Sequence, residues 1–170
     1  SRFKSVAQTL KEVPVVSAAL GPVAGLPASR FVGSHFRIMV KDNAQILVAG
    51  PAVVSRAFGK DFTKEELGGS DVHKKNGVTD NIAESEEDAF NQIKKFLSFF
   101  PANIYELPPK KDSKDKTDRS EKILEEIIPK DRKKTYEMRE IINLVVDDKD
   151  FFEISNFFGR GIITGFARLN

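Results

Sequence analysis

Apolar side chains follow two different spacings in the N-terminal part of the chain. Residues 13–20 form a nearly continuous apolar run with β-branched members, bounded by Gly21, which predicts a fully buried strand. Residues 85–97 instead carry apolar side chains at helical spacing, behind an acidic start and ahead of two lysines, which predicts an amphipathic helix. Shorter apolar runs predict two further strands, joined by a turn, at 37–40 and 45–49.

Glycine, proline and capping residues place helices between these strands. A short helix is predicted at 28–36, and another begins at Pro51, because proline suits the first helical turn. Capping-box spacing at 63–66 predicts a helical turn that ends at Gly68 and Gly69. A strand, a glycine turn and a helix that recur with short connections indicate an α/β fold.

Residues 108–118 mark a sharp change of composition. They contain no large apolar side chain, which predicts a solvated linker. Short helices are predicted at 120–128 and 136–147, and strands at 151–154 and 162–167, where a second strand-rich unit begins. A bare apolar strand edge is a liability, so we expect the rest of the protein or another subunit to cover residues 162–167.

The overall composition excludes several kinds of function. The 170 residues are 40% hydrophobic and 31% charged, with a net charge of only +2, which offers no basic surplus for nucleic acid. There is no cysteine for disulfides or thiolate metal sites, and two histidines, His35 and His73, are too few for a His-rich metal site. No apolar run is long enough to span a membrane. The chain has no initial methionine and stops just after an apolar run, so we expect a piece of a longer protein.

The strongest local feature is the turn between the first predicted strand and the next helix, Gly21-Pro22-Val23-Ala24-Gly25-Leu26. A strand that turns into a helix exposes backbone N–H groups that lack a partner in the helix, and such donors suit an anion or a developing oxyanion. The glycine spacing matches neither a P-loop nor a dinucleotide fingerprint. On local physics alone, glycines at such a place more often only make the turn.

This turn, followed by a helix and then by residues 36–40, resembles the oxyanion turn and following strand of acyl-CoA carboxyltransferases. Similar segments follow in the same order at 49–54, 65–69, 73, 77–78, 128–129, 136–142, 146–147, 151–153 and 163–169. The resemblance covers essentially the whole chain and is closest to the β subunits of the propionyl-CoA and methylcrotonyl-CoA carboxylase type.

The resemblance implies a ClpP/crotonase-like α/β fold, with part of one domain and the start of a second. Residues 1–107 would be the C-terminal part of the first carboxyltransferase domain, which binds the acyl-CoA. Residues 108–134 would form a charged linker with a short helix. Residues 135–170 would begin the second carboxyltransferase domain, which binds biotin.

The resemblance also implies a reaction and its participants. Carboxybiotin on a separate carrier would give its carboxyl group to the α-carbon of an acyl-CoA thioester, and the backbone amides of Gly25 and Leu26 would hold the enolate. Ala24, Pro27 and His35 would contact the substrate. The partners would be a biotin carboxylase, a biotin carrier subunit and further copies of the chain in a trimer or hexamer. The location would be the bacterial cytoplasm or the mitochondrial matrix.

Several residues have an alternative interpretation. Many members of the resembled family have glycine where Leu26 stands, so Leu26 either reshapes the acyl pocket or packs in the core. His35 is read more simply as a histidine at a helix end, and His73 as a structural or site-wall residue. The basic cluster at 130–134 either meets CoA phosphates or is a solvated charge run, and the second reading is favoured.

Two alternatives to a carboxylase component also remain open. The chain could belong to a biotin-dependent acyl-CoA decarboxylase, which runs the same transfer in reverse. It could also be a truncated assembly module without catalysis, since a second oxyanion turn should lie beyond its last residue. We expect the 170 residues alone to be inactive.

Overall fold

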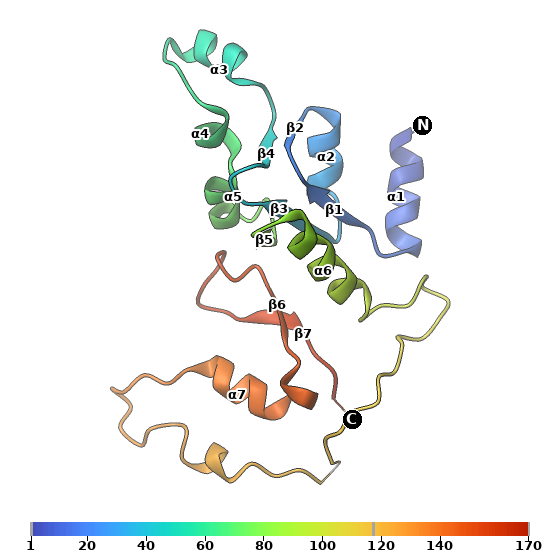
Figure 1. Ribbon diagram of the computed structural model, residues 1–170, viewed down its shortest axis with the longest axis vertical. Coiled ribbons are helices and arrows are strands. Elements are labelled where there is room, and N and C mark those ends of the chain that lie inside the picture. Colours follow the sequence, from blue (N-terminus) through green and yellow to red (C-terminus); the bar gives the residue numbers. More distant parts are fainter. Residues whose placement is uncertain (1, 117, 170) are drawn as a thin grey trace.

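The computed structural model describes residues 2–116 and 118–169 as helices joined to three small sheets (Figure 1). The helices are α1 (Arg2–Glu12), α2 (Leu26–Val32), α3 (Pro51–Phe58), α4 (Lys64–Gly68), α5 (Ser70–Asn76), α6 (Glu86–Leu97) and α7 (Met138–Val145), with 3₁₀ turns η1 (Lys122–Glu125) and η2 (Asp147–Lys149). The strands are β1 (Val16–Ala19), β2 (Pro22–Ala24), β3 (Phe36–Val40), β4 (Gln45–Leu47), β5 (Asn81–Ala83), β6 (Phe152–Ile154) and β7 (Thr164–Phe166). None of the described helices is long and apolar enough to cross a membrane.

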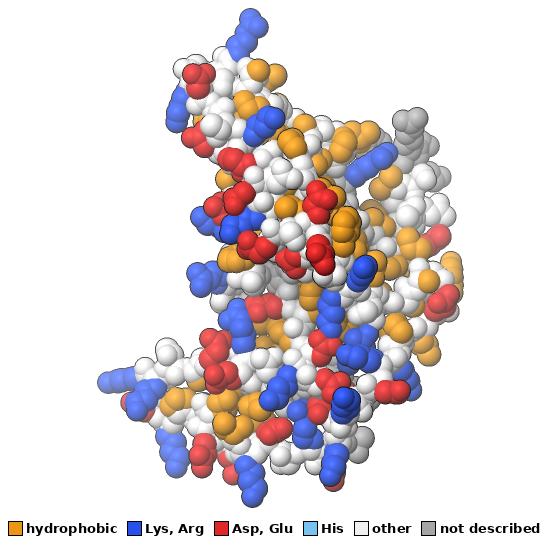
Figure 2. Space-filling model, in the orientation of Figure 1, with side chains coloured by type: hydrophobic (Ala, Val, Ile, Leu, Met, Phe, Trp, Pro, Cys, Tyr) orange, Lys and Arg blue, Asp and Glu red, His pale blue; other side chains and the backbone are white. Residues whose placement is uncertain are grey.

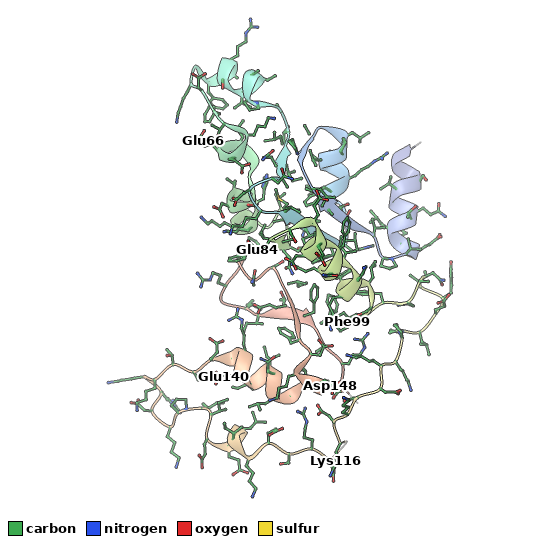
Figure 3. The ribbon with its side chains drawn as sticks, in the orientation of Figure 1. Glu66, Glu84, Phe99, Lys116, Glu140 and Asp148 are labelled. Carbon is green, nitrogen blue, oxygen red and sulfur yellow. The ribbon has the colours of Figure 1, made fainter. Side chains whose placement is uncertain are left out.

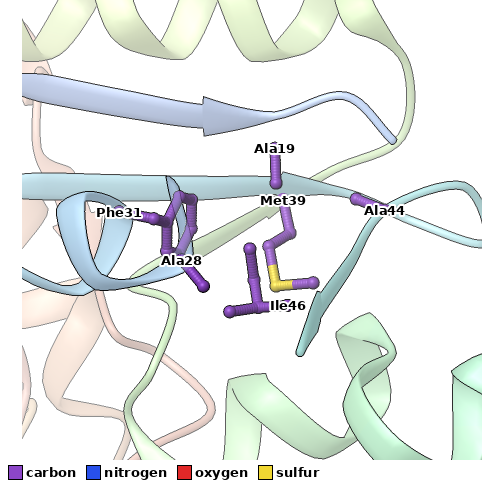
Figure 4. Packing of buried hydrophobic residues seen from close by; sticks show 6 residues of the cluster. All are labelled: Ala19, Ala28, Phe31, Met39, Ala44 and Ile46. Atoms are coloured by element: carbon purple, nitrogen blue, oxygen red, sulfur yellow. The ribbon is translucent and has the colours of Figure 1, made fainter. Parts of the chain in front are cut away.

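Strand β3 is the centre of the fold. It pairs in parallel with β1 on one side and with β5 on the other, while β2 and β4 form a separate parallel pair. Phe36, Ile38 and Val40 join the apolar cluster that contains Phe96 of α6. Met39 points to the opposite face of β3 and belongs to a second apolar cluster, which also contains Phe31 and Ile46 (Figure 4). The two-residue alternation of a strand thus divides one element between two cores.

A cluster of phenylalanines joins the C-terminal hairpin of β6 and β7 to β3 and α6. The rings of Phe36 and Phe96 are stacked at 4.7 Å between centroids, and Phe152 of β6 meets Phe36 edge-on at 5.7 Å. Phe166 of β7 meets Phe96 edge-on at 5.6 Å and also contacts Phe99, which is labelled near the hairpin in Figure 3. Offset and edge-on aromatic pairs add to the free energy of apolar burial, so the hairpin is held to α6 by its own side chains.

The hairpin meets one sequence-based expectation only in part. The strand at 162–167 was expected to need cover from outside the chain. Instead its central part, β7, pairs antiparallel with β6, and Phe166 packs against the cluster around α6. An earlier part of the same chain therefore pairs with one edge of β7, whereas its other edge has no strand partner among the described residues and Ile162 stays 75% exposed.

An ion pair also links three parts of the chain. The Asp80 carboxylate accepts hydrogen bonds from the Arg37 backbone N–H at 2.8 Å and from the Arg37 guanidinium at 3.0 and 2.7 Å. The Ser155 hydroxyl donates to the same carboxylate at 3.2 Å, and the Ser155 N–H donates to the Asp80 carbonyl at 3.0 Å. Strand β3, the residues before β5 and the end of β6 therefore meet at one buried carboxylate.

The segment between α6 and the hairpin is mostly exposed and highly charged. On the face shown in Figure 2, basic and acidic side chains are interspersed over the lower part, around α7. Lys95 and Lys111 both pair with Asp150, and their charges and hydrogen bonds lower the pKa of the Asp150 carboxyl. This contact attaches the linker and η2 to α6.

The sequence prediction of helices and strands is confirmed in outline. Helix α6 and the capping box at Thr63 appear where expected. The predicted helix at 28–36 is displaced, because α2 begins at Leu26 and ends before β3. Strand β2 was missed inside the glycine-rich turn, and β3 and β4 belong to different sheets rather than pairing with each other.

Two more predictions need correction or remain open. The predicted helix at 120–128 is reduced to the four residues of η1, which are largely exposed and lack an apolar face against the core. The division of the chain at 107 and 134 stays a prediction.

We expect Asp80→Ala to lower the free energy of unfolding by about 3–5 kcal/mol, because it leaves the Arg37 guanidinium without its partner. Asp80 is 9% exposed, whereas Glu84, which pairs with Lys41, is 75% exposed. The matched control Glu84→Ala should therefore change stability little. Urea unfolding of both variants measures the difference, and similar losses for the two would contradict this account of the ion pair.

Candidate active site

The turn between β2 and α2 has a backbone conformation that requires glycine. Gly25 has φ 67° and ψ −130°, a combination that residues with a side chain rarely adopt. A Cβ atom built on Gly25 would meet nothing within 4 Å, so the requirement is conformational and not one of space. Because Gly25 has the positive φ, Leu26 is an ordinary first residue of helix α2 and needs no left-handed conformation.

The amides of Gly25 and Leu26 are not equivalent. The Gly25 N–H donates to the Leu47 carbonyl at 3.3 Å, which continues the β2–β4 pairing by one residue. The Leu26 N–H opens the helix, where no intrahelical acceptor exists, and no acceptor for it is found among the described residues. The pair of donors stays a prediction, but in this conformation Leu26 is the residue that presents an available N–H.

The neighbouring residues leave this amide accessible. Ala24, Gly25 and Pro27 are all exposed, and Pro27 at the second helical position has no N–H of its own. Leu26 is 45% exposed, so the alternative that it simply packs in the core is wrong. The substrate contacts assigned to Ala24 and Pro27 stay predictions.

His35 lies at the other end of α2 from the turn. Its ring Nδ1 atom accepts a hydrogen bond from the Val15 backbone N–H at 3.0 Å. The backbone N–H of His35 donates to the Val15 carbonyl at 2.9 Å. The seven residues of α2 span about 10 Å and separate His35 from Gly25. This geometry favours the helix-end interpretation, in which His35 fixes the start of β1 beside β3.

His73 stabilises strand β4, which in turn holds the Gly25 turn. Its Nε2 atom lies 2.8 Å from the Ile46 carbonyl, and its Nδ1 atom lies 3.3 Å from the Asn76 amide, so His73 donates to strand β4 as the Nε2–H tautomer. Gly68 lies against the same carbonyl, and a Cβ there would come within 2.1 Å of the Ile46 oxygen. Both residues hold β4, whose Leu47 carbonyl fixes the Gly25 turn. The sequence signal for this support was the Gly68-Gly69 pair, which we read only as a helix end.

A groove beside the turn is lined by residues of α1 and α2. The two helices are neighbours in Figure 1. The groove has a volume of about 430 Å³, and Leu26, Ser29, Arg30 and Gly33 line it from one face of α2. Helix α1 and strand β1 form the other walls. This groove could not be predicted from the sequence, since only the fold brings α1 beside α2.

Two other candidate chemistries find no site here. Among residues 2–116 and 118–169, no cluster of three or more His, Cys, Asp or Glu side chains could hold a metal ion. The basic cluster at 130–134 lies on the exposed segment between η1 and α7, away from α2 (Figure 1). This placement fits a solvated charge run.

Comparison with known proteins identifies the family. Residues 2–170 match the family model described as "Carboxyl transferase domain". The chain belongs to this family. Among solved structures, transcarboxylase 12S, described as a hexamer with hydrolysed methylmalonyl-CoA bound, superimposes with a TM-score of 0.92 at 31% identity, over 99% of this chain and 33% of that chain. This match confirms the predicted crotonase-like α/β fold.

Curated carboxyl transferase relatives match over nearly the whole chain. The propionyl-CoA carboxylase beta chain of Roseobacter denitrificans is 36% identical over 158 residues, 92% of this chain and 31% of that protein. The mitochondrial propionyl-CoA carboxylase beta chain of Homo sapiens is 35% identical over 93% of this chain and 30% of its own length. The methylmalonyl-CoA decarboxylase subunit alpha of Veillonella parvula is 34% identical over 93% and 31%. The chain thus spans about a third of the length of these relatives.

We expect Gly25→Ala to destabilise the protein by about 1–3 kcal/mol, because alanine at this φ and ψ is strained. Gly21→Ala is the matched control, since Gly21 has no positive φ and also has nothing within 4 Å of a built Cβ. Urea unfolding should show a much smaller loss for the control. Equal losses would mean that the turn does not depend on the Gly25 conformation.

Proposed function

We propose that this chain provides the acyl-CoA side of a biotin-dependent carboxyltransferase. A carboxyl group on biotin would pass to the α-carbon of an acyl-CoA through an enolate held by backbone amides. The observation that carries the proposal is the Leu26 N–H, which lies at an exposed strand-to-helix turn without an acceptor among the described residues. Membership of the carboxyl transferase family gives this donor its chemical context.

The proposed reaction needs fixed hydrogen-bond donors and does not need a side chain that titrates. When the α-proton leaves, negative charge develops on the thioester oxygen, and one preorganised N–H donor there is worth about 3 kcal/mol. Such holes commonly combine two donors. The second would be Gly25 after its N–H leaves Leu47, or an N–H from a part of the protein outside these residues.

The partners follow from what the sequence lacks and from its relatives. It contains no Ala-Met-Lys-Met-like attachment site, so biotin would arrive as carboxybiotin on a carrier subunit, loaded by a biotin carboxylase. The hexamer described for transcarboxylase 12S supports a trimeric or hexameric homo-oligomer. Relatives described as bacterial and as mitochondrial support the bacterial cytoplasm or the mitochondrial matrix as the location.

A decarboxylase subunit is the second candidate. The decarboxylase subunit of Veillonella parvula is 34% identical to the chain, nearly as similar as the carboxylase relatives. The same backbone donors would serve either direction, because forward and reverse transfer share one enolate. A biotin carboxylase partner would favour the carboxylase, and a membrane decarboxylase partner would favour the decarboxylase.

Replacing Leu26 by proline tests the proposed donor. Proline fits the first helical position but has no N–H, so Leu26→Pro removes the donor with little change to the helix. The carbonyl carbon-13 resonance of labelled propionyl-CoA should move downfield on binding to the protein, and this shift should be lost in the variant. Leu26→Ala keeps the N–H and should keep most of the shift. A shift that survives in Leu26→Pro would remove Leu26 from the oxyanion site.

We further expect the 170 residues alone to form no methylmalonyl-CoA from free carboxybiotin and propionyl-CoA. The described part of the biotin-side unit is limited to α7, η2 and one hairpin. Product would be measured by mass spectrometry, with a complete propionyl-CoA carboxylase as positive control. Product above the blank that disappears in Leu26→Pro would contradict the half-site proposal and show a complete site.

A further inference from the structure

We propose that the groove between α1 and α2 binds the acyl chain of the substrate, and that Leu26 forms its inner wall. The proposal rests on the function proposed above and adds a substrate class to it. The class is an acyl-CoA with an apolar chain longer than propionyl. The position of Leu26, the chemistry of the walls and the size of the groove all suit such a chain.

Leu26 connects the groove to the proposed oxyanion site. Its N–H is the available donor of the turn, and the same residue lines the groove together with Ser29, Arg30 and Gly33. These positions are spaced three, four and seven residues from Leu26, so they share one face of α2. An acyl group whose thioester oxygen meets the Leu26 amide therefore has the groove directly beside it.

The wall of the groove that α1 and the start of β1 provide is largely apolar, while Ser5, Ser29 and Arg30 also line the groove and have no side-chain partner among the described residues. Val6, Leu10 and Val15 face Leu26 from α1 and from the residues before β1. The hydroxyl of Thr9 donates to the carbonyl of Ser5 at 3.0 Å. A hydrocarbon chain can lie against these walls without leaving the Thr9 hydroxyl unpaired.

The two serines at the floor of the groove also satisfy each other. The Ser34 hydroxyl donates to the Arg30 carbonyl at 3.0 Å. Since Ser34 has one hydroxyl proton, Ser17 must be the donor in the 2.6 Å contact between the two hydroxyls. These two serines therefore have no hydroxyl donor left for a polar ligand, and the apolar side chains of Val6, Leu10, Val15 and Leu26 are what favour a hydrocarbon chain in the groove.

The groove is larger than a propionyl group needs. Its volume of about 430 Å³ is in the range of small-molecule sites, roughly 300–1,000 Å³. A methylene group takes up about as much space as one liquid water, roughly 30 Å³. A propionyl group would leave most of the groove unfilled, whereas an octanoyl chain, with seven carbons beyond the carbonyl, would fill about half of it.

The test compares propionyl-CoA and octanoyl-CoA by isothermal titration calorimetry on the purified protein. Each fully buried methylene strengthens binding up to about fourfold. The groove is open on one side, so we expect octanoyl-CoA to bind at least about tenfold more tightly than propionyl-CoA. Equal affinities would overturn the proposal while leaving the carboxyltransferase function intact. Equal affinities are also the result if another part of the protein fills the groove.

Variants that fill the groove test whether the preference for octanoyl-CoA arises there. Ser29→Phe places a ring in the groove, and the two thioesters should then bind within about twofold of each other. Gly33→Leu is a second filling variant, because its Cβ would meet only ordinary contacts, 3.4 Å from the Ser29 carbonyl. Val32→Phe is the matched control, since Val32 is half-exposed on α2 but does not line the groove.

The remaining outcomes also decide the question. A preference for octanoyl-CoA that persists in both filling variants would show that the chain binds elsewhere, and it would overturn the proposal. If neither thioester binds, both this proposal and the proposed function fail. The carbon-13 shift of bound propionyl-CoA distinguishes failure of the acyl-chain proposal from failure of the proposed function. It reports the contact of the thioester with the Leu26 amide and does not depend on a long chain.

Discussion

The fold depends on one strand that is buried on both faces. Phe36, Ile38 and Met39 of β3 are fully buried, and the alternation of the strand sends Met39 to one core and the other two to the second. The first core includes α2, so it sets where the proposed oxyanion turn lies. The second includes α6 and the phenylalanines of the hairpin. A shift of β3 by one residue would move each of its side chains to the opposite face and disrupt both cores.

Sequence patterns predicted the elements whose signals are local. Helix α6 was clear because its apolar spacing, acidic first turn and Ser85 cap agree with one another. Strand β2 was missed because three residues inside a turn rich in glycine and proline have no periodic signal, and only pairing with β4 makes them a strand. The same pairing occupies the Gly25 amide, so the difference between Gly25 and Leu26 could not be read from the sequence.

The proposed chemistry relies on backbone geometry supported at a distance. The Leu47 carbonyl holds Gly25, and the neighbouring Ile46 carbonyl is held in turn by His73 and by the close approach of Gly68. A backbone donor cannot be changed by ordinary substitution, so its position is controlled by residues that never touch the substrate. His73 is such a residue, because its contacts with Ile46 and Asn76 are structural. The groove has a separate origin, since it forms only where α1 and α2 lie side by side.

Leu26 shows how one residue can serve reaction and selectivity separately. Its N–H depends on the backbone alone, and its conformation is ordinary because Gly25 has the positive φ. The side chain is therefore free to vary without moving the donor. With glycine at this position the amide would remain while the inner wall of the groove would disappear. The family could thus keep one way of holding an enolate and alter the acyl chain it accepts by changing the side chain beside it.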